Sequence, residues 1–528
     1  MDNFIKTNPE SLIYQNGILK LTVLGGIKLD ALDRMRATLK VELNESSLPT
    51  MRHNLDLYND IQVEKFIRKV AERLEIGTSV VSASLSELTE QLETYRIEKL
   101  KEKEPELPQR PTLSAKERKE AEGFLEAPNL LQRTNELIGK SGMIGEENNR
   151  ILMYLIFTSR MRSHPLHIVS LGASGTGKTH LQEKVGELIP EEDKIEITTL
   201  SENAFYYFGQ RELTNKLILI EDLDGAESSL YPLRELQSKK RISKTIAHKS
   251  KTGETKRLHL VVEGPVSVGG CTTREQIYED NANRSFLIYL DESAEQDKRI
   301  MVYQRAVSAG QVNEHEEEQA TILLKNVQRT LEPIRVVNPF ADRLILPKEV
   351  FKPRRTNTHY LQFIEVVTFY NQLQREQKVN EKTGEIYIET TLEDIEEANK
   401  LLKPILLRKS DTITGASRNH FEKLKLYLVG DDKKEFTNVE ISKLFRVSIA
   451  TIKRYHLNLL INGYLKLVKK KGKKSHFYAV VSYEEFQELQ NSINTTLDKV
   501  LETIKANQKV SSKKNKGTGK AQKLSSAQ

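Results

Sequence analysis

The 528-residue sequence contains a single cysteine, Cys271. One cysteine excludes an internal disulfide and a zinc site built from a cysteine cluster. No apolar run approaches the roughly 18–20 residues that a transmembrane helix needs. The first ten residues carry Asp2 and Glu10 and lack the apolar stretch of a signal peptide. We therefore expect a cytoplasmic protein without a membrane-spanning segment.

Positive charge is concentrated near the C-terminus. Hydrophobic residues make up 38% of the chain and charged residues 29%, so the chain has enough apolar material for packed cores. Its length predicts three or four domains. The formal net charge is +7, and it becomes −6 without thirteen clustered lysines. This clustering favours a polyanionic partner, nucleic acid first. The thirteen are Lys466, Lys469, Lys470, Lys471, Lys473, Lys474, Lys505, Lys509, Lys513, Lys514, Lys516, Lys520 and Lys523.

Periodicity and composition divide the chain into six segments. Residues 60–74 predict an amphipathic helix, and the charged, proline-rich stretch 101–111 predicts a linker. Strand-like runs then alternate with helical stretches, which is typical of an α/β sheet. The expected segments are an α+β N-terminal module (1–110), a linker with a helix (111–135), an α/β core (136–293), a helical segment (294–410), a small α+β unit (411–485) and a basic disordered tail (486–528).

The strongest motif runs from Gly172 to Thr179 and fits the phosphate loop G-x-x-x-x-G-K-[ST]. An apolar strand, 167–171, precedes it and a predicted helix, 180–188, follows, which disfavours a mere glycine-rich turn. The loop predicts a site for ATP and Mg²⁺. Its backbone N–H groups surround the phosphates, Lys178 reaches the β- and γ-oxygens, and Thr179 coordinates the metal ion. The nucleotide-binding residues are Gly172, Ser174, Gly175, Thr176, Gly177, Lys178 and Thr179.

Two acids, Glu221 and Asp222, follow the apolar run 217–220. A buried strand that ends in two carboxylates matches a Walker B element, in which one holds Mg²⁺ and the other orients the attacking water. The alternative is an ordinary strand with a polar turn. Together with the phosphate loop, this pair predicts hydrolysis rather than binding alone.

Two further polar residues have catalytic potential. Thr272 follows the apolar strand 266–268, where a hydroxyl can touch the γ-phosphate or the attacking water, and Thr273 is close behind. Arg284 lies just before another strand and fits an arginine finger that reaches a neighbouring subunit's γ-phosphate. The alternatives are a simple turn at Thr272 and a surface ion pair at Arg284.

These motifs resemble AAA+ ATPases, and among them the MCM-like helicases, from Leu137 to Leu406. The stretch 138–147 is similar to the family's I-x-G-H-E lead-in, and 220–224 is similar to its I-D-E-F-D. The resemblance implies a P-loop AAA+ core followed by a helical lid. It also assigns the Mg²⁺ ligand to Glu221 and the catalytic base to Asp222, with the order of the two acids swapped.

A basic hairpin is expected between the Walker B element and Thr272. Residues 241–247 and 256–262 alternate like two strands around a turn-rich tip. The resemblance implies a pre-sensor hairpin that lines a ring pore and contacts DNA phosphates through Lys249, Lys251 or Lys256. The alternative is a solvated surface hairpin.

The family's lid contributes a second nucleotide sensor, for which Arg354 and Arg355 are the candidates. Thr391 is expected to cap a closing helix, with Asp394 at the third helical position. The layout is similar to replication ATPases of bacterial mobile elements, which often work beside a primase. The chain has no cysteine-rich finger, so a primase would act in trans.

The segment 437–480 predicts a winged helix. Thr437 caps a helix over 438–445, a three-residue turn follows, and a second helix covers 449–462. Two short strands then flank a lysine-rich wing. The alternative is a winged helix used for protein contacts. The candidate DNA contacts are Thr451, Lys453, Arg454, Lys469, Lys470, Lys471, Lys473 and Lys474.

The leading interpretation is an ATP-hydrolysing DNA helicase or translocase that works as a homo-oligomeric ring in replication of a mobile element. A finger at Arg284 needs a neighbouring subunit, which favours the ring. One alternative is a helicase loader or replication initiator that uses ATP as a switch. Another is a DNA-binding regulator with an inactive ATP site. An AAA+ transcriptional activator is disfavoured because its polymerase-contact loop is absent, and no motif assigns a role to residues 1–110.

Overall fold

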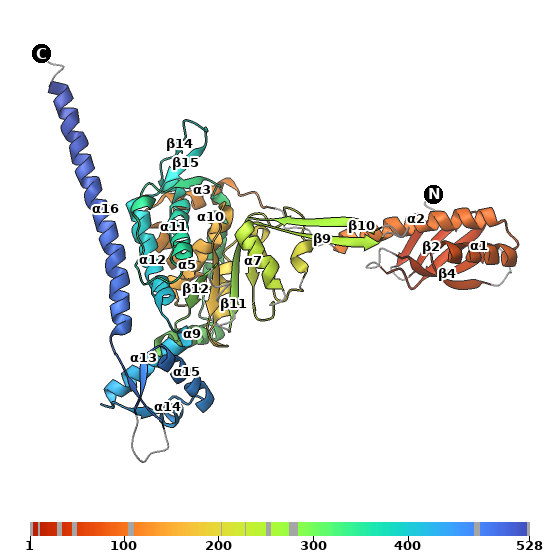
Figure 1. The fold of residues 1–528 in the computed structure, drawn as a ribbon. Coiled ribbons are helices and arrows are strands. Elements are labelled where there is room, and N and C mark those ends of the chain that lie inside the picture. The colour runs from red at the N-terminus through yellow and green to blue at the C-terminus, as the bar shows by residue number, and fades with distance from the viewer. Residues whose placement is uncertain are drawn as a thin grey trace. The chain divides into compact units, whose positions relative to one another are not determined.

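The computed structural model describes ten stretches of the chain, and the polypeptide divides into two compact units, Met1–Gln109 and Arg110–Gln528 (Figure 1). Among the helices in these stretches, none combines the length and hydrophobicity that a bilayer crossing requires. The described residues are 4–8, 11–28, 34–44, 50–103, 110–201, 203–226, 229–249, 255–273, 284–468 and 476–524.

The first unit is an antiparallel five-stranded sheet with two helices packed on one face. Alternate strand residues and the apolar faces of the helices form its core. The predicted helix over 60–74 is confirmed, and the Asn59 side chain caps it by accepting a hydrogen bond from the Gln62 N–H. The strands follow chain order: β1 (Phe4–Asn8), β2 (Ser11–Asn16), β3 (Leu19–Leu24), β4 (Arg36–Leu43) and β5 (Met51–Asp56), then α1 (Asp60–Leu74) and α2 (Thr78–Lys103).

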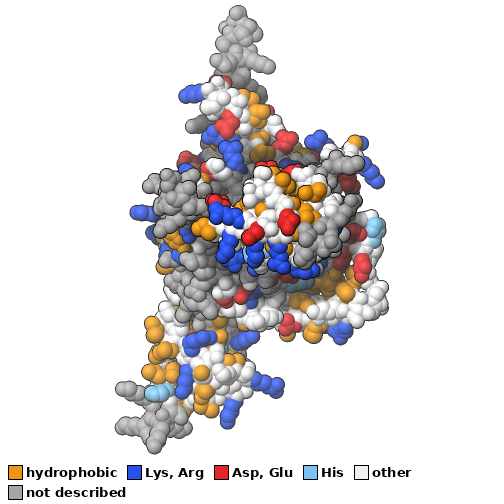
Figure 2. All heavy atoms as spheres, turned by 90° about the vertical axis from the view of Figure 1, so that its right-hand side faces the viewer, with side chains coloured by type: hydrophobic (Ala, Val, Ile, Leu, Met, Phe, Trp, Pro, Cys, Tyr) orange, Lys and Arg blue, Asp and Glu red, His pale blue; other side chains and the backbone are white. Residues whose placement is uncertain are grey.

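The other face of this sheet is polar and basic. Strand register puts Lys40 directly opposite Arg52, and Lys20 opposite Glu42. Figure 2 faces this unit and shows Lys and Arg side chains in a band across it. The sheet is therefore amphipathic, with one face buried by helices and the other solvated.

The second unit is built on a parallel five-stranded sheet, which confirms the predicted α/β core. The strand order is β12-β6-β11-β8-β7, and β6 is buried along its whole length. All carboxyl ends of the strands therefore meet at one edge, where ligands bind in sheets of this kind. The strands are β6 (His167–Leu171), β7 (Lys194–Ile197), β8 (Lys216–Ile220), β11 (Val266–Thr272) and β12 (Phe286–Tyr289).

Helices cover this sheet and share one hydrophobic core with it. Residues 151–157 of α5 are hydrophobic and all buried, so this part of the helix is surrounded by the core on every side. Gly269 of β11 allows close packing, since a Cβ there would lie 2.9 Å from the Leu219 and Phe157 side chains. The helices are α3 (Ala115–Glu126), α4 (Leu130–Lys140), α5 (Glu147–Thr158), α6 (Lys178–Gly186) and α7 (Leu230–Lys239), with short 3₁₀ turns at Ser159–Met161, Glu191–Asp193 and Ala204–Tyr207.

The segment 294–410 contains the predicted helices and also a small three-stranded sheet that the sequence analysis does not predict. Thr391 and Asp394 form the expected capping box of α12. Buried residues of α10, α11 and α12 belong to the same core as the helices of the P-loop sheet. The elements are α9 (Ala294–Ser308), α10 (Glu314–Thr330), β13 (Arg335–Val337), α11 (Pro353–Tyr370), β14 (Lys378–Val379), β15 (Ile386–Glu389) and α12 (Leu392–Ser410), with 3₁₀ turns at Ala341–Arg343 and Gln372–Gln374.

The predicted hairpin is confirmed between α7 and β11. β9 (Arg241–Lys249) pairs with β10 (Thr255–Glu263) in antiparallel register over their full length. The two strands extend away from the parallel sheet as a narrow ribbon (Figure 1).

Residues 411–484 form a separate small fold, here called the C-terminal module. Three helices enclose an apolar core with a three-stranded antiparallel sheet of order β16-β18-β17. The Thr437 side chain caps α14 by accepting a hydrogen bond from the Glu440 N–H, as expected. The elements are α13 (Gly415–Gly430), β16 (Phe436–Thr437), α14 (Asn438–Phe445), α15 (Ile449–Ile461), β17 (Leu465–Val468) and β18 (Phe477–Val480).

The sequence analysis predicts a disordered tail from residue 486, and this prediction is wrong. Residues Glu485–Leu524 form one helix, α16, which contacts α12. Its Ile493, Leu497, Leu501 and Ile504 are buried at helical spacing. Two ion pairs join the helices, Lys403–Asp498 at 2.8 Å and Lys505–Glu396 at 2.8 Å. The prediction relied on the lysine-rich composition of the tail and missed this apolar stripe.

Candidate nucleotide site

The phosphate loop connects the end of β6 to the start of α6. Gly175 and Gly177 adopt positive φ angles, 84° and 89°, that a side chain would strain. Lys178 is buried, and its Nζ donates hydrogen bonds to the carbonyls of Gly172, at 2.9 Å, and Ala173. Lys178 is thus tied to the backbone of the loop at the N-terminus of α6, and a helix N-terminus favours anion binding.

The neighbouring strands bring the predicted catalytic residues to the same edge. β11 pairs with β6 so that Thr272 lies opposite Leu171, and with β8 so that Gly270 lies opposite Ile220. Glu221 and Asp222 follow Ile220 directly. The Gln182 side chain of α6 donates to the Ile220 carbonyl at 3.1 Å. The phosphate loop, the two acids and Thr272 therefore share one edge of the sheet.

Asp224 is a site residue that the sequence analysis does not single out. Its Oδ1 accepts a hydrogen bond from the Thr272 hydroxyl at 2.6 Å. Its Oδ2 accepts from the Thr273 N–H at 3.1 Å and from the Thr273 hydroxyl at 2.8 Å. Asp222 in turn accepts from the Asp224 N–H at 2.9 Å. The available signal in the sequence is the final acid of the I-D-E-F-D-like motif, and this acid fixes the end of β11 to the acidic turn.

The lone cysteine, Cys271, lies on β11 opposite Ser170 of β6, the strand that leads into the phosphate loop. Burial raises the pKa of the Cys271 thiol to about 12, although Lys178 opposes the shift. The thiol stays protonated and therefore fills space rather than reacting as a thiolate. The sequence predicts no catalytic role for Cys271, and the structure describes none.

The donor set at this edge fits Mg²⁺ bound together with a nucleotide. Thr179 supplies a hydroxyl, and Glu221 and Asp222 supply carboxylates beside the phosphate loop. In the described stretches, no group of three or more His, Cys, Asp or Glu side chains forms a ready-made metal cluster. The donor set of one hydroxyl and two carboxylates suits Mg²⁺, which is usually held by one or two carboxylates plus substrate phosphates.

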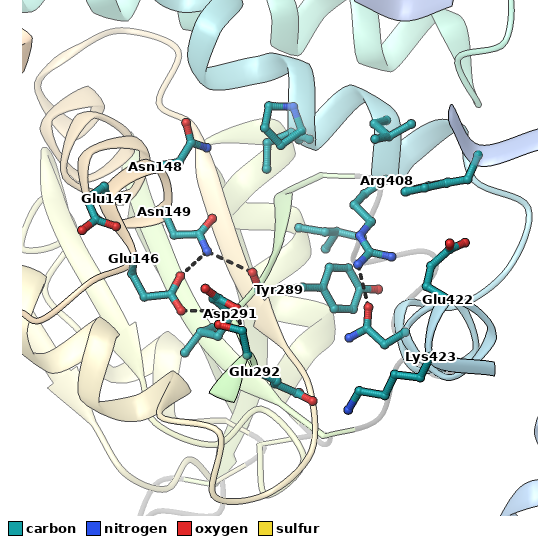
Figure 3. Close-up of a pocket in the computed structure, with 18 of the residues that line it drawn as sticks. Glu146, Glu147, Asn148, Asn149, Tyr289, Asp291, Glu292, Arg408, Glu422 and Lys423 are labelled. Carbon is teal, nitrogen blue, oxygen red and sulfur yellow. Dashed lines mark hydrogen bonds between the residues drawn. The ribbon is translucent and has the colours of Figure 1, made fainter. Parts of the chain in front are cut away.

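A pocket of about 650 Å³ opens beside the phosphate loop (Figure 3). Two of its lining residues touch the loop: Leu290 lies 3.7 Å from the Cβ position of Gly177, and Glu292 lies 3.7 Å from that of Gly172. Glu146 and Asn149 line the same wall. A nucleotide whose phosphates bind at the loop can therefore extend its base into this pocket, here called the base pocket.

Hydrogen bonds hold the lead-in loop, the stretch within residues 138–147 that brings Glu146 and Glu147 to the base pocket. The Arg150 guanidinium donates to the carbonyls of Met143, at 2.8 Å, and Gly145, at 3.1 Å. Glu146 accepts hydrogen bonds from the Asn149 amide at 2.6 Å and from the Asp291 N–H at 2.7 Å (Figure 3). Burial nevertheless raises the pKa of Glu146 above its ordinary value. The sequence locates this loop only through its resemblance to the family lead-in.

The three predicted arginines gather at the other edge of the sheet. Arg284, Arg354 and Arg355 line a second cleft of about 360 Å³ together with His167, the first residue of β6. Lys178 follows the opposite end of β6. Within one chain the structure thus places Arg354 and Arg355 away from the phosphate loop, and their role as nucleotide sensors stays a prediction. Both arginines lie within the first turn of α11.

This arginine cleft is strongly cationic. Its lining includes Lys240 in addition to the three arginines, and no carboxylate among the described residues. Burial lowers the pKa of His167 to about 3, with Arg284 adding to the shift. The half-buried Arg284 donates from Nε to the Ser238 hydroxyl at 2.8 Å. The cleft is therefore a surface suited to an anion, separated from the phosphate loop by the length of β6.

The candidate DNA contacts are described only in part. Lys453 and Arg454 are exposed on the first half of α15, where Ile452 faces the core. Thr451 is half-buried, and its N–H donates to the Ser448 cap at 3.2 Å. Lys249 and Lys256 lie on β9 and β10 with only their backbone described, and Lys251 lies outside the described residues. Also outside them are Lys469, Lys470, Lys471, Lys473 and Lys474.

Comparisons with known proteins agree with the phosphate loop. Residues 114–333 match the family described as MTBMA_p00010 P-loop domain, and this range contains the phosphate loop. No curated protein matches the chain.

Two solved structures are similar at low scores. A full-length MCM homolog from Methanopyrus kandleri is 11% identical, with 76% of this chain and 75% of that chain covered and a TM-score of 0.36. A Drosophila ORC bound to DNA is 12% identical, with coverages of 75% and 99% and a TM-score of 0.22. Scores this low bear on neither the activity nor the assembly of this protein.

Proposed function

We propose that this protein is an ATP-hydrolysing DNA helicase or translocase that acts as a homo-oligomeric ring. One observation carries the proposal: a P-loop, two carboxylates and Thr272 share one edge of the sheet, while a cleft of arginines lies at the other. A nucleotide at the first edge can receive from a neighbouring copy the arginines that the second edge carries.

The chemistry at the first edge is phosphoryl transfer to water. Backbone N–H groups of the loop and Lys178 hold the phosphates, and Mg²⁺ supplies charge neutralisation when bound. Glu221 would hold the metal ion through its carboxylate, and Asp222 would orient the attacking water. Asp224 positions Thr272 and Thr273 through the three hydrogen bonds it accepts from them. Thr272 is then positioned to contact the γ-phosphate or the attacking water.

The ring follows from the arginine cleft. Arg284, Arg354 and Arg355 line one cleft together, and three guanidinium groups can stabilise the charge of an external triphosphate. In a closed ring each copy presents this cleft to the nucleotide of the next. Arg284 acts there as the finger, and Arg354 and Arg355 act as sensors of that neighbouring nucleotide.

DNA contact is assigned to two basic elements. The β9–β10 ribbon has Lys249 and Lys256 at the ends of its strands, with Lys251 between them in the sequence, and it grips the DNA strand that passes through the ring. The C-terminal module has the helix, strand, helix, helix and hairpin order of a winged helix, with Lys453 and Arg454 on its third helix. Its lysine-rich wing binds phosphates rather than reading bases. Replication of a mobile element, with any primase acting in trans, is the setting that the sequence resemblance favours.

The test measures ATP hydrolysis and strand displacement on a forked duplex. We expect DNA-stimulated hydrolysis and displacement, and a loss of about 10²–10³-fold in turnover for Lys178→Ala, since a donor to the transferring phosphoryl group is removed. Lys184→Ala, later on α6, is the matched control and should stay active. ATP binding without displacement would favour a helicase loader or initiator, and DNA binding without hydrolysis would favour a regulator.

A further inference from the structure

The outer wall of the base pocket is formed by the C-terminal module. Asn419, Glu422, Lys423 and Leu426, all on α13, line it, and Phe486 of α16 completes it. The opposite wall comes from the lead-in loop and the end of β12 (Figure 3). A ligand in this pocket therefore touches both the P-loop domain and the module.

The junction between the two walls is tightly packed. A Cβ at Gly415, the first residue of α13, would overlap the Tyr289 ring at the end of β12. The Arg408 guanidinium, from α12, also lies over the Tyr289 ring, 5.0 Å from its centre. It also donates to the Asn419 Oδ1 at 2.9 Å. A continuous set of contacts thus runs from Leu290, beside the phosphate loop, through Tyr289 and Arg408 to α13.

The charges in the pocket select the uncharged end of a nucleotide. Glu146, Glu147, Asp291 and Glu292 line the P-loop side. On this wall four carboxyl groups repel phosphates and offer acceptors for an amino group on a base, whereas the cations of the pocket, Arg408 and Lys423, come from α12 and α13. Phosphates are therefore confined to the loop, and an amino-bearing base fits the pocket.

One donor at the junction lacks a partner. The Nη1 atom of Arg408 is buried and has no hydrogen-bond partner among the described residues. A buried donor left unpaired destabilises a structure by about 1–3 kcal/mol. A small movement of α13, or an acceptor on a bound base, would satisfy it. The junction is therefore sensitive to what occupies the pocket.

We propose that α13 closes the base subsite of the nucleotide, so that nucleotide occupancy fixes the position of the C-terminal module and DNA bound to the module changes nucleotide affinity. This inference rests on the proposed function, which supplies both ligands. Because coupling between two binding sites is reciprocal, nucleotide must change DNA affinity by the same factor.

The main experiment uses a matched pair of glycine substitutions on α13. Gly415→Ala wedges a methyl group against Tyr289, whereas Gly430→Ala, at the last residue of α13, meets nothing within 4 Å. The dissociation constant of a fluorescent ATP analogue is measured with and without a saturating duplex of roughly 30 base pairs, about three turns of the double helix. We expect wild type and Gly430→Ala to show a ratio of at least about fivefold, the lower end of typical coupling. Gly415→Ala should bring that ratio close to one while DNA affinity without nucleotide stays unchanged.

A second pair keeps the inference testable if Gly415→Ala folds poorly. Lys423→Ala removes a pocket-lining side chain, and Lys434→Ala removes an exposed lysine of the module away from the pocket. Lys423→Ala should weaken binding of the analogue and reduce the ratio, and Lys434→Ala should do neither. A wild-type ratio of one, or equal ratios in all four variants, would overturn the inference. If wild type and Lys178→Ala bind the analogue equally, the proposed function itself fails.

Discussion

Glu221 and Asp222 differ in their surroundings, and the difference bears on their swapped order. Glu221 is half-buried, whereas Asp222 is exposed and accepts a hydrogen bond from the Asp224 N–H. We expect Asp222→Asn to keep Mg²⁺–ATP binding and to lose at least about 10²-fold in turnover, because the group that orients water is neutralised. Glu221→Gln should weaken the Mg²⁺ dependence instead. Hydrolysis rates across a Mg²⁺ titration measure both effects.

The reverse pattern would reverse the two roles. If Glu221→Gln stops turnover while Mg²⁺ affinity stays at the wild-type value, Glu221 is the base and Asp222 the ligand. Glu196→Gln, on the neighbouring strand β7, removes an exposed carboxylate and serves as the control.

A pair of buried histidines makes the C-terminal module sensitive to acid. The Nε2 atoms of His420 and His456 lie 2.9 Å apart. Burial lowers the pKa of His420 to about 4 and that of His456 to about 3. The unfolded chain takes up protons below about pH 6.5, whereas the folded module resists them, so stability is complete above pH 6.5 and falls towards pH 3. At a pH of about 4.5 we expect a loss of roughly 2–3 kcal/mol per histidine, visible as a lower Tm.

Two variants separate this pair from other acid effects. His456→Gln keeps a hydrogen-bonding side chain without a titrating imidazole, so its Tm should depend less on pH than that of wild type. His315→Gln changes an exposed imidazole on α10 and should keep the full dependence. An unchanged pH dependence in His456→Gln would contradict the prediction.

At the residue scale, contiguous motifs are predictable and tertiary neighbours are not. The phosphate loop depends on spacing within one short motif, so its strand and helix context can be inferred directly. Asp224 acquires its role only when β11 lies between β6 and β8. The edge of the sheet at which Arg354 and Arg355 lie could not be predicted, because linear order does not reveal which edge of a sheet a distant helix reaches. The base pocket is assembled from separate segments of the chain and has no sequence motif.

The two basic elements should differ in what they control. Replacing Lys469, Lys470 and Lys471 by Ala should weaken DNA binding and reduce the salt slope by about 0.7–0.9 for each phosphate that the wing no longer neutralises. Replacing Lys249, Lys251 and Lys256 by Ala should leave binding nearly unchanged, because the wing still holds the DNA. It should instead reduce DNA-stimulated hydrolysis and strand displacement. Binding across a salt series, alongside displacement assays, measures both. Wild-type displacement by the hairpin variant would make the hairpin a solvated loop.

At the element scale, hydrophobic periodicity is a better guide than composition. The helix over 60–74 and the capped helices at Thr391 and Thr437 match their predicted starts because each combines an apolar stripe with a cap. α16 escapes prediction because its lysine content suggests disorder, although its stripe lies at helical spacing. The sheet of β13, β14 and β15 escapes prediction because its strands have only two to four residues each.

At the scale of the whole molecule, the arginine cleft predicts activity shared between copies. In the proposed ring each Arg284 serves the site of its neighbour, so we expect mixtures of wild type and Arg284→Ala to lose hydrolysis more steeply than the fraction of variant. The measurement is ATPase rate against mixing ratio at constant total protein. Arg335→Ala, which breaks an exposed ion pair with Glu385, is the control and should leave mixtures active. Strictly proportional loss would make Arg284 a structural residue and remove the support for a ring.

The position of α16 also sets an order of events while the chain is being made. Four apolar residues of α16, from Ile493 to Ile504, complete the core that the helices around the parallel sheet begin. At about 5–20 residues per second, a ribosome needs roughly 5–20 s to proceed from the end of α12 to Ile504. During that interval the face of α12 that α16 will cover is open to chaperones and to other nascent chains. A message that ends before the codon for Ile493 leaves it open for good, so truncated products should be removed by proteolysis or aggregate even though their phosphate loop is intact.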